Sequence, residues 1–166
     1  MRIRAEVPGD YPSVHLINAA AFGVETEAKL IGVLRAQASP LVSLVADDEG
    51  TLVGHIMFSP VSLPGIEELA MGLAPMAVTP LRQRSGIGSA LVKAGLQRCK
   101  ELGAVAVVVL GHPEFYPKFG FSPAERFGLN CEYDVPAEAF MAIELHAGAL
   151  CGASGTVKYH AAFSQL

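Results

Sequence analysis

The chain has 166 residues, of which 51% are hydrophobic, and its formal net charge is −4 at pH 7. This length suffices for one domain with its own core and is short for two. The longest apolar run, AVAVVVL from Ala104 to Leu110, has the length of a buried strand and falls far short of the roughly 18 residues that a membrane span needs. A nucleic-acid partner would require clustered Lys and Arg, so neither a membrane nor a nucleic acid is expected as a partner.

The first half of the chain predicts an alternation of strands and helices. Asp10 is expected to cap a helix that runs through Val14 and Ala20, because the apolar residues there recur at helical spacing. A second helix is expected over residues 25–37 for the same reason. The acidic turn DDEG joins two predicted strands, and a loop containing SLPG separates them from the next one. The expected strands cover residues 3–7, 41–46, 51–58 and 69–78.

The second half of the chain predicts one long helix followed by a buried strand. The helix covers residues 85–102, and Gly103 is well placed to end it. The strand covers residues 104–110. Beyond residue 125 the pattern is less periodic, so MAIELH, residues 141–146, is the one strand expected there and the tail is expected to be loosely held.

Nothing in the sequence divides the chain into parts. We find no repeat or linker, which predicts a single α/β domain over residues 1–166. The N-terminal MRIRAEVPGD has no apolar leader, so a cytoplasmic location is expected. The three cysteines, Cys99, Cys131 and Cys151, lack metal-ligand spacing. We therefore expect buried or incidental thiols and no metal.

The segment VTPLRQRSGIGSALVKAGL, which begins at Val78, has the composition of an anion-binding turn. The first turn of a helix carries unpaired N–H groups and partial positive charge. Gly86 and Gly88 lack a Cβ and allow a phosphate to approach the backbone, while Arg82 and Arg84 add charge. The spacing is neither that of a P-loop nor that of the dinucleotide fingerprint. On this segment alone, the alternative is that the glycines serve helix packing and the arginines are solvated.

Pro75 lies in the middle of the apolar strand that precedes this turn. Proline cannot donate to a sheet ladder, so it predicts a bulge or a local separation from a neighbouring strand. Backbone groups freed at Met76 and Val78 would then need partners, and an amide-bearing ligand can supply them as a strand does. A ligand with an amide-rich arm joined to a pyrophosphate fits both features, and coenzyme A is such a molecule.

Two motifs resemble those of the GCN5-related N-acetyltransferase (GNAT) family. QRSGIG, residues 83–88, matches the signature Q/R-x-x-G-x-G/A, and VVVLGHPEFYPKFGF, residues 107–121, looks like the fifth strand of that family and the segment that follows it. The resemblance is greatest to the branch of predicted acetyltransferases. It implies an α/β (α+β) fold with a mixed, mostly antiparallel central sheet flanked by helices, in which the fourth and fifth strands are splayed.

The resemblance also implies which residues hold acetyl-CoA. The acetyl and pantetheine parts pair with the backbone of the bulged strand, and the pyrophosphate is bound by backbone amides of the signature turn. A tyrosine after the fifth strand often protonates the departing thiolate, and Tyr116 occupies that place; its alternative role is aromatic packing beside Phe115 and Phe119. The implied cofactor-binding residues are Met76, Ala77, Val78, Arg84, Ser85, Gly86, Ile87, Gly88 and Ser89.

The implied reaction is transfer of the acetyl group from acetyl-CoA to a primary amine of a small molecule or peptide. The general base is not assigned, because the strand of residues 69–78 lacks the glutamate that many family members carry there. The candidates are Glu27, Glu67, Glu68, His112 or water. The favoured alternative for His112 is a loop histidine that caps a strand, and the favoured alternative for Glu27 is a position on a solvated helix face. His55 is expected to be a partly buried sheet residue.

Two alternative functions follow from the missing glutamate. The chain could bind acyl-CoA as a sensing module without turnover, or act as a structural partner with a vestigial site. Dimers are common in the family, which makes a homodimer compatible with the resemblance. The identity of the amine acceptor and the oligomeric state stay open at this point.

Overall fold

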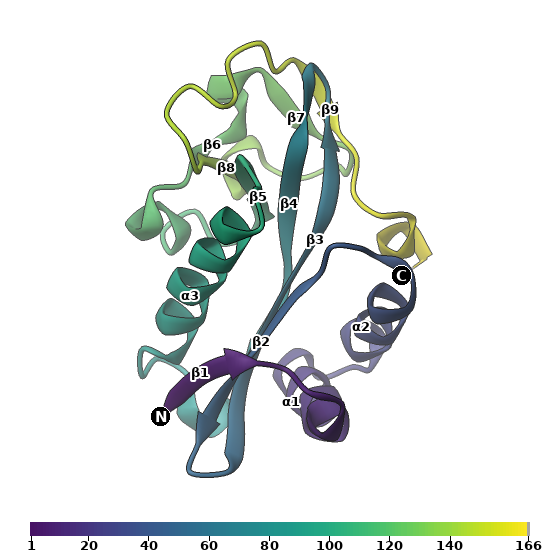
Figure 1. Ribbon diagram of the computed structural model, residues 1–166, viewed down its shortest axis with the longest axis vertical. Helices are drawn as coiled ribbons and strands as arrows, with labels where there is room; N and C mark the ends of the chain where they lie inside the picture. Colours follow the sequence, from purple (N-terminus) through teal and green to yellow (C-terminus); the bar gives the residue numbers. More distant parts are fainter. Residues whose placement is uncertain (166) are drawn as a thin grey trace.

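The computed structural model describes residues 1–165 and is built on a central seven-stranded sheet (Figure 1). The strand order is β1-β2-β3-β4-β5-β8-β6, and of the neighbouring pairs only β4 and β5 are parallel. Helix α3 lies on one side of this sheet, and α1 and α2 lie on the other (Figure 1). This arrangement confirms the predicted mixed, mostly antiparallel α/β fold.

The elements have the following bounds. The strands of the central sheet are β1 Arg2–Ala5, β2 Val42–Asp48, β3 Thr51–Leu63, β4 Ile66–Val78, β5 Ala106–Leu110, β6 Ser122–Pro123 and β8 Phe140–Glu144. A second, two-stranded sheet pairs β7 Leu129–Cys131 with β9 Gly155–Val157. The helices are α1 Tyr11–Phe22, α2 Thr26–Gln37 and α3 Ile87–Glu101. Gly103, with φ of 91°, follows α3 as predicted.

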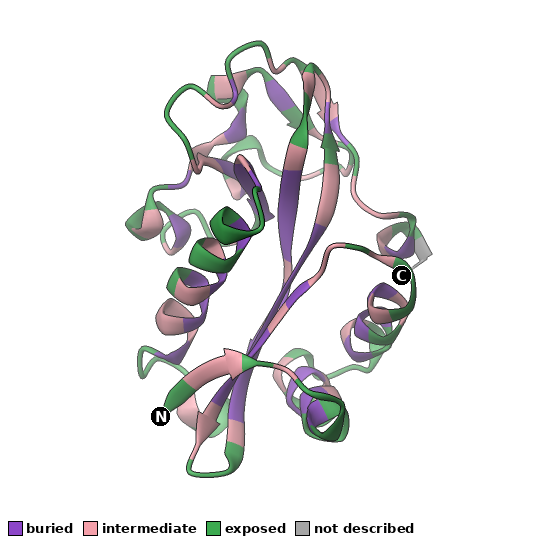
Figure 2. Cartoon of the chain, viewed as in Figure 1, coloured by how far each residue is buried: buried purple, intermediate pink, exposed green. Residues whose placement is uncertain are grey.

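Helix α3 packs closely on the central sheet. Its buried residues share the core with Phe58 of β3, and Figure 2 shows the buried positions gathered on the sheet and on the inner sides of the helices. At Gly95 the approach is so close that a Cβ would lie 2.2 Å from Phe58 Cε1. Glycine at this helical position therefore serves packing, because interiors at native density leave no room for an added methyl group.

Gly95→Ala should lower the free energy of unfolding by about 1–3 kcal/mol, because the added methyl group overpacks the contact with Phe58. Urea denaturation measures this change. Gly32→Ala in α2 is the matched control, since nothing lies within 4 Å of a Cβ there. That control should stabilise the protein by up to about 1 kcal/mol, and equal effects of the two substitutions would contradict the packing role of Gly95.

The β3–β4 hairpin is longer than the sequence predicted. Both strands extend to Leu63 and Ile66, which pair directly across Pro64 and Gly65, so the loop expected around SLPG is a tight turn. The prediction was wrong because Pro60 and the acidic residues Glu67 and Glu68 are of types that are uncommon inside strands. Pro60 nevertheless pairs with Met71 in the ladder.

The C-terminal segment is held in place, and the expected loose tail was wrong. Ser62 and Lys158 exchange two backbone hydrogen bonds of 2.9 and 3.0 Å, and β9 pairs with β7. Val157 is 0% exposed and Ala162, in the 3-10 turn η6 (Ala161–Gln165), is 3% exposed. The periodicity was too weak to reveal this because β7 and β9 have three residues each and pair over a long sequence separation.

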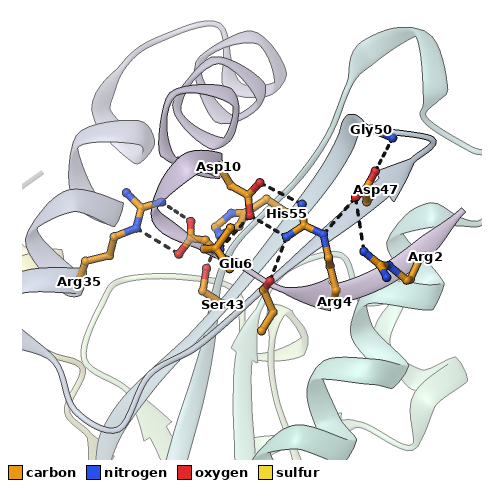
Figure 3. A network of polar contacts seen from close by, with 11 residues as sticks. Arg2, Arg4, Glu6, Asp10, Arg35, Ser43, Asp47, Gly50 and His55 are labelled. Carbon is orange, nitrogen blue, oxygen red and sulfur yellow. Dashed lines mark hydrogen bonds and ion pairs between the residues drawn. The ribbon is translucent and has the colours of Figure 1, made fainter.

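A polar network lies between β1, the 3-10 turn Pro8–Asp10 (η1) and the β2–β3 hairpin (Figure 3). Arg4 bridges Asp10 and Asp47, and these contacts hold the pKa of both carboxyl groups below their usual range. Asp10 occupies the predicted cap position of α1, but its carboxylate accepts from Val7 N at 2.8 Å and from Arg4 instead of capping that helix.

His55 is fully buried on β3 beside this network. Its Nδ1 lies 3.2 Å from Asn18 Nδ2, and its Nε2 lies 2.9 Å from Ser43 Oγ. Burial, and secondarily the charge of Arg35, lowers the pKa of His55 to about 3. His55 is thus a neutral core residue, more deeply buried than the sequence suggested.

Candidate active site

A cavity of about 610 Å³ opens where β4 and β5 separate. The two strands pair from Ala70–Ala106 to Leu73–Val109, whereas β4 continues to Val78. The cavity is therefore bordered by the end of β4, which pairs with β3 but not with β5, by the segment after β5, and by elements from the two sides of the sheet. Its wall comprises Phe22, Glu27, Leu30, Leu73, Ala74, Pro75, Met76, Val78, Gln83, Arg84, Leu110, Gly111, His112, Phe115, Tyr116 and Phe163.

The backbone of β4 presents hydrogen-bonding groups to this cavity. The register with β3 shifts by one residue between Met76 and Leu73, which places a bulge at Pro75 as the sequence predicted. Thr79 N donates to Val53 O at 2.9 Å. Because groups alternate along an antiparallel ladder, Ala77 faces β3, while Met76 and Val78 face the side from which β5 has separated. Gln83 Nε2 donates to the Val78 carbonyl at 3.1 Å.

The turn before α3 leaves the first N–H groups of that helix free of intrahelical partners. The first helical bond runs from Ala90 N to Gly86 O at 3.1 Å, and no described side chain caps the helix. The N–H groups of Ile87, Gly88 and Ser89 therefore gather at a helix end with partial positive charge. This end can hold an anion such as a pyrophosphate.

The backbone of the same turn depends on left-handed conformations. Gly86 has φ of 91°, with nothing within 4 Å of a Cβ built on it, and Arg84 has φ of 63°. Ser85 Oγ donates to Arg82 O, which fixes the turn. Arg84 lines the cavity, whereas Arg82 pairs with Asp48 at 2.9 Å and so contributes less free charge than the sequence suggested.

Gly86→Val should weaken acetyl-CoA binding at least tenfold, equivalent to about 1.4 kcal/mol, because it strains a left-handed residue and adds a side chain at the anion-binding helix end. Isothermal titration calorimetry measures the affinity. Gly103→Val is the matched control, since Gly103 has the same φ of 91°, equally open surroundings and a place at the opposite end of α3. A similar loss of affinity in the control would mean that strain alone causes the effect.

Tyr116 is buried at the wall of the cavity, in the 3-10 turn Tyr116–Phe119 (η3). Its ring packs edge-on against Phe115 at 5.0 Å and Phe121 at 5.6 Å between centroids. A Cβ at Gly111 would lie 2.4 Å from its Cε2, so this glycine makes room for the ring. Burial raises the pKa of Tyr116 to about 12. Tyr116 thus both packs against neighbouring aromatic rings and lines the cavity, so the geometry is compatible with either of its two expected roles.

The candidates for the general base fall into two groups. Glu27 and His112 line the cavity, whereas Glu67 and Glu68 are exposed near the start of β4, far along the strand from Pro75. His112 is exposed, and its backbone carbonyl accepts a hydrogen bond from Phe115 N at 3.1 Å at the start of the turn. Glu27 is half-buried, with Oε2 buried and without a hydrogen-bond partner among the described residues.

Three wall residues were not foreseen from the sequence as parts of a site. Phe22 ends α1, Leu30 lies in the second turn of α2, and Phe163 belongs to η6. The helical spacing of Leu30 indicated burial without distinguishing core from cavity wall, and Phe163 carried no signal. The cavity joins these residues to motifs more than 40 positions away in the sequence.

Three further observations concern metal-binding groups, free thiols and membrane-spanning helices in the described part of the chain. Within residues 1–165, no group of three His, Cys, Asp or Glu side chains is arranged to hold a metal ion. The free thiols are Cys99, which is buried, Cys131, which is half-buried, and Cys151, which is exposed. No helix in the same range combines the length and apolar character that crossing a membrane requires.

Comparisons with known proteins identify the family. The family model of the acetyltransferase (GNAT) domain matches residues 2–124. The uncharacterized N-acetyltransferase YhbS of Escherichia coli K12 is 38% identical over 166 residues, covering 99% of each chain. The chain belongs to the GNAT family of acetyltransferases. This confirms the family and the class of enzyme, an N-acetyltransferase, that the two sequence motifs predicted.

Two solved structures share the fold over nearly the whole chain. The crystal structure of YhbS from Escherichia coli, in complex with CoA, has a TM-score of 0.92 and 36% identity, covering 98% of this chain and 91% of that one. A GNAT family acetyltransferase from Brucella melitensis, in complex with acetyl-CoA, has a TM-score of 0.81 and 34% identity, covering 98% and 97%.

Proposed function

We propose that this protein transfers an acetyl group from acetyl-CoA to a primary amine of a small molecule or peptide. One observation carries the proposal: a single cavity brings together the unpaired backbone of β4, the turn before α3 and the tyrosine of η3. The CoA and acetyl-CoA bound in the two related structures support it. Residues 1–166 would form one such domain acting in the cytoplasm, as the sequence predicts.

The cavity and the turn beside it fit acetyl-CoA as co-substrate: Met76, Val78 and Arg84 line the cavity, whereas Ala77 and residues 85–89 lie next to it. Met76 and Val78 would pair with the amides of the pantetheine arm as a neighbouring strand would, with Ala77 holding β4 to β3 between them. The signature turn, residues 84–89, would bind the pyrophosphate through backbone N–H groups at the end of α3. The fit follows from the uncapped helix end and from glycines whose missing side chains leave the approach open.

The same residues suit the chemistry of acetyl transfer. When an amine attacks the thioester carbonyl, charge builds on the carbonyl oxygen, and a backbone N–H at the bulge of β4 can stabilise it. The departing thiolate has an ordinary pKa near 8.5. Tyr116, kept neutral by burial, can donate a proton to that sulfur.

Binding and turnover together test this function. Calorimetry should detect acetyl-CoA binding, and a thiol assay should detect free CoA released faster when a primary amine is added. Mass spectrometry should find the acetylated amine. Tight acetyl-CoA binding without acceleration by any amine would favour the sensing module, and no binding would favour the structural partner.

A further inference from the structure

We propose that the acceptor is a primary monoamine carrying an apolar group and that Glu27 binds its ammonium. This inference deepens the proposed function and rests on it. It starts from a wall of the cavity that the cofactor motifs do not supply. This acceptor wall consists of Phe22, Glu27, Leu30 and Phe163.

The acceptor wall is assembled by three elements on one side of the sheet. Phe22 closes α1, Glu27 and Leu30 lie three residues apart near the start of α2, and Phe163 comes from η6. Residues three apart on a helix share one face. Figure 1 shows the C-terminal turn beside α2, on the side of the sheet opposite α3. An acceptor could therefore enter opposite the helix whose end fits the pyrophosphate.

Glu27 supplies the polar recognition on this wall. Its Oε2 is buried and accepts no hydrogen bond from any described residue. A buried carboxylate oxygen without a partner is costly. An ammonium group in the cavity would satisfy it through a charge-assisted hydrogen bond. Because this nitrogen is also the nucleophile, it would pass one proton to Glu27 or to water before it attacks the thioester.

The composition of the acceptor wall favours an acceptor molecule with one positive charge and an apolar group. Glu27 is the single acidic side chain among the described lining residues, whereas Phe22, Leu30 and Phe163 are apolar. A polyamine or an aminated sugar would place charges or hydroxyl groups against apolar side chains that cannot hydrogen-bond them, at an energetic cost. A monoamine with an aromatic or aliphatic group buries that group instead.

The test compares three primary amines as acceptors with saturating acetyl-CoA. We expect kcat/KM for 2-phenylethylamine to exceed that for spermidine and for glucosamine at least tenfold. Glu27→Gln, which keeps the side-chain shape, should lower kcat/KM for 2-phenylethylamine at least tenfold, chiefly through a higher KM, with acetyl-CoA affinity unchanged. Phe22→Ala should lower kcat/KM for 2-phenylethylamine more than for glucosamine.

Glu25→Gln is the matched control for the charge, because Glu25 precedes α2, pairs with His15 and does not line the cavity. Its kinetic constants should equal those of the wild type. A preference for spermidine or glucosamine, or an unchanged KM in Glu27→Gln, would overturn this inference and leave the acetyltransferase function standing. Acetyl-CoA binding without turnover of any amine would instead remove the proposed function, and this inference with it.

Discussion

Tyr116→Phe should lower kcat about 100-fold while leaving the affinity for acetyl-CoA unchanged. General acid catalysis contributes typically 10²–10⁴-fold, and the substitution removes only the hydroxyl group. The ring contacts with Phe115 and Phe121 are kept, so the stability should change little. Steady-state thiol release with the best amine, together with calorimetric binding of acetyl-CoA, separates the chemical step from binding.

Tyr133→Phe is the matched control for this prediction. Tyr133 stacks on Tyr159 at 6.0 Å between centroids and does not line the cavity. The Tyr133→Phe substitution also removes one hydroxyl group, and it should leave kcat within twofold of wild type. Since burial raises the pKa of Tyr116 to about 12, the acid stays protonated, and kcat should not fall through loss of this proton below about pH 11. If the Tyr116→Phe enzyme keeps the wild-type kcat, Tyr116 serves only in aromatic packing and the acid role is wrong.

Acidification from pH 6 to pH 4.5 should destabilise the protein, with a slope approaching about 1.4 kcal/mol per pH unit from His55 alone. The pKa of His55 is lowered from 6.5 to about 3 in the folded protein. Between these values the unfolded state binds the proton and the folded state does not, so stability is lost as pH falls below 6.5. Urea unfolding measured across this range gives the slope.

His55→Gln should remove most of this slope, because the titrating group is gone. His15→Gln should keep it, since His15 is half-exposed and its ring does not lie in the core. The lowered pKa values of Asp10 and Asp47 act in the same direction but at lower pH, which is why the window stops at 4.5. Should His55→Gln fail to fold, NMR titration of the wild type decides: a His55 ring that protonates above pH 5 would contradict the prediction.

The fold could be predicted where its signals are local. Pro75 predicted both the bulge in β4 and the separation of β4 from β5, because proline has no N–H to donate to a sheet. The helices and the buried strand after α3 followed from periodicity. The C-terminal region could not be predicted in this way, because β7, β9 and η6 are short and are stabilised by partners distant in the sequence.

The candidate site divides in the same manner. The half expected to bind the cofactor lies in two continuous motifs, so residues 76–78, 84–89 and Tyr116 could be named from the sequence, and their roles stay predictions. The acceptor wall could be foreseen only in part: Glu27 was a candidate from the sequence, whereas Phe22 and Phe163 join it only after folding. The sequence alone favoured a solvated helix position for Glu27, whereas in the fold Glu27 lines the cavity together with residues of α1 and η6.

The two halves of the cavity are built by different stretches of the chain, and this has a consequence for how selectivity can change. Residues 22–30 and the C-terminal turn are separate in the sequence from the β4 bulge and the α3 turn, so we expect substitutions of their cavity-lining residues to leave those two features in place. If the proposed roles hold, we expect acceptor preference to change without a change in acetyl-CoA affinity. Exchange of these two segments between relatives should transplant amine preference onto an unchanged acetyl-donor half, which makes the protein a convenient scaffold for engineering new acetylation specificities.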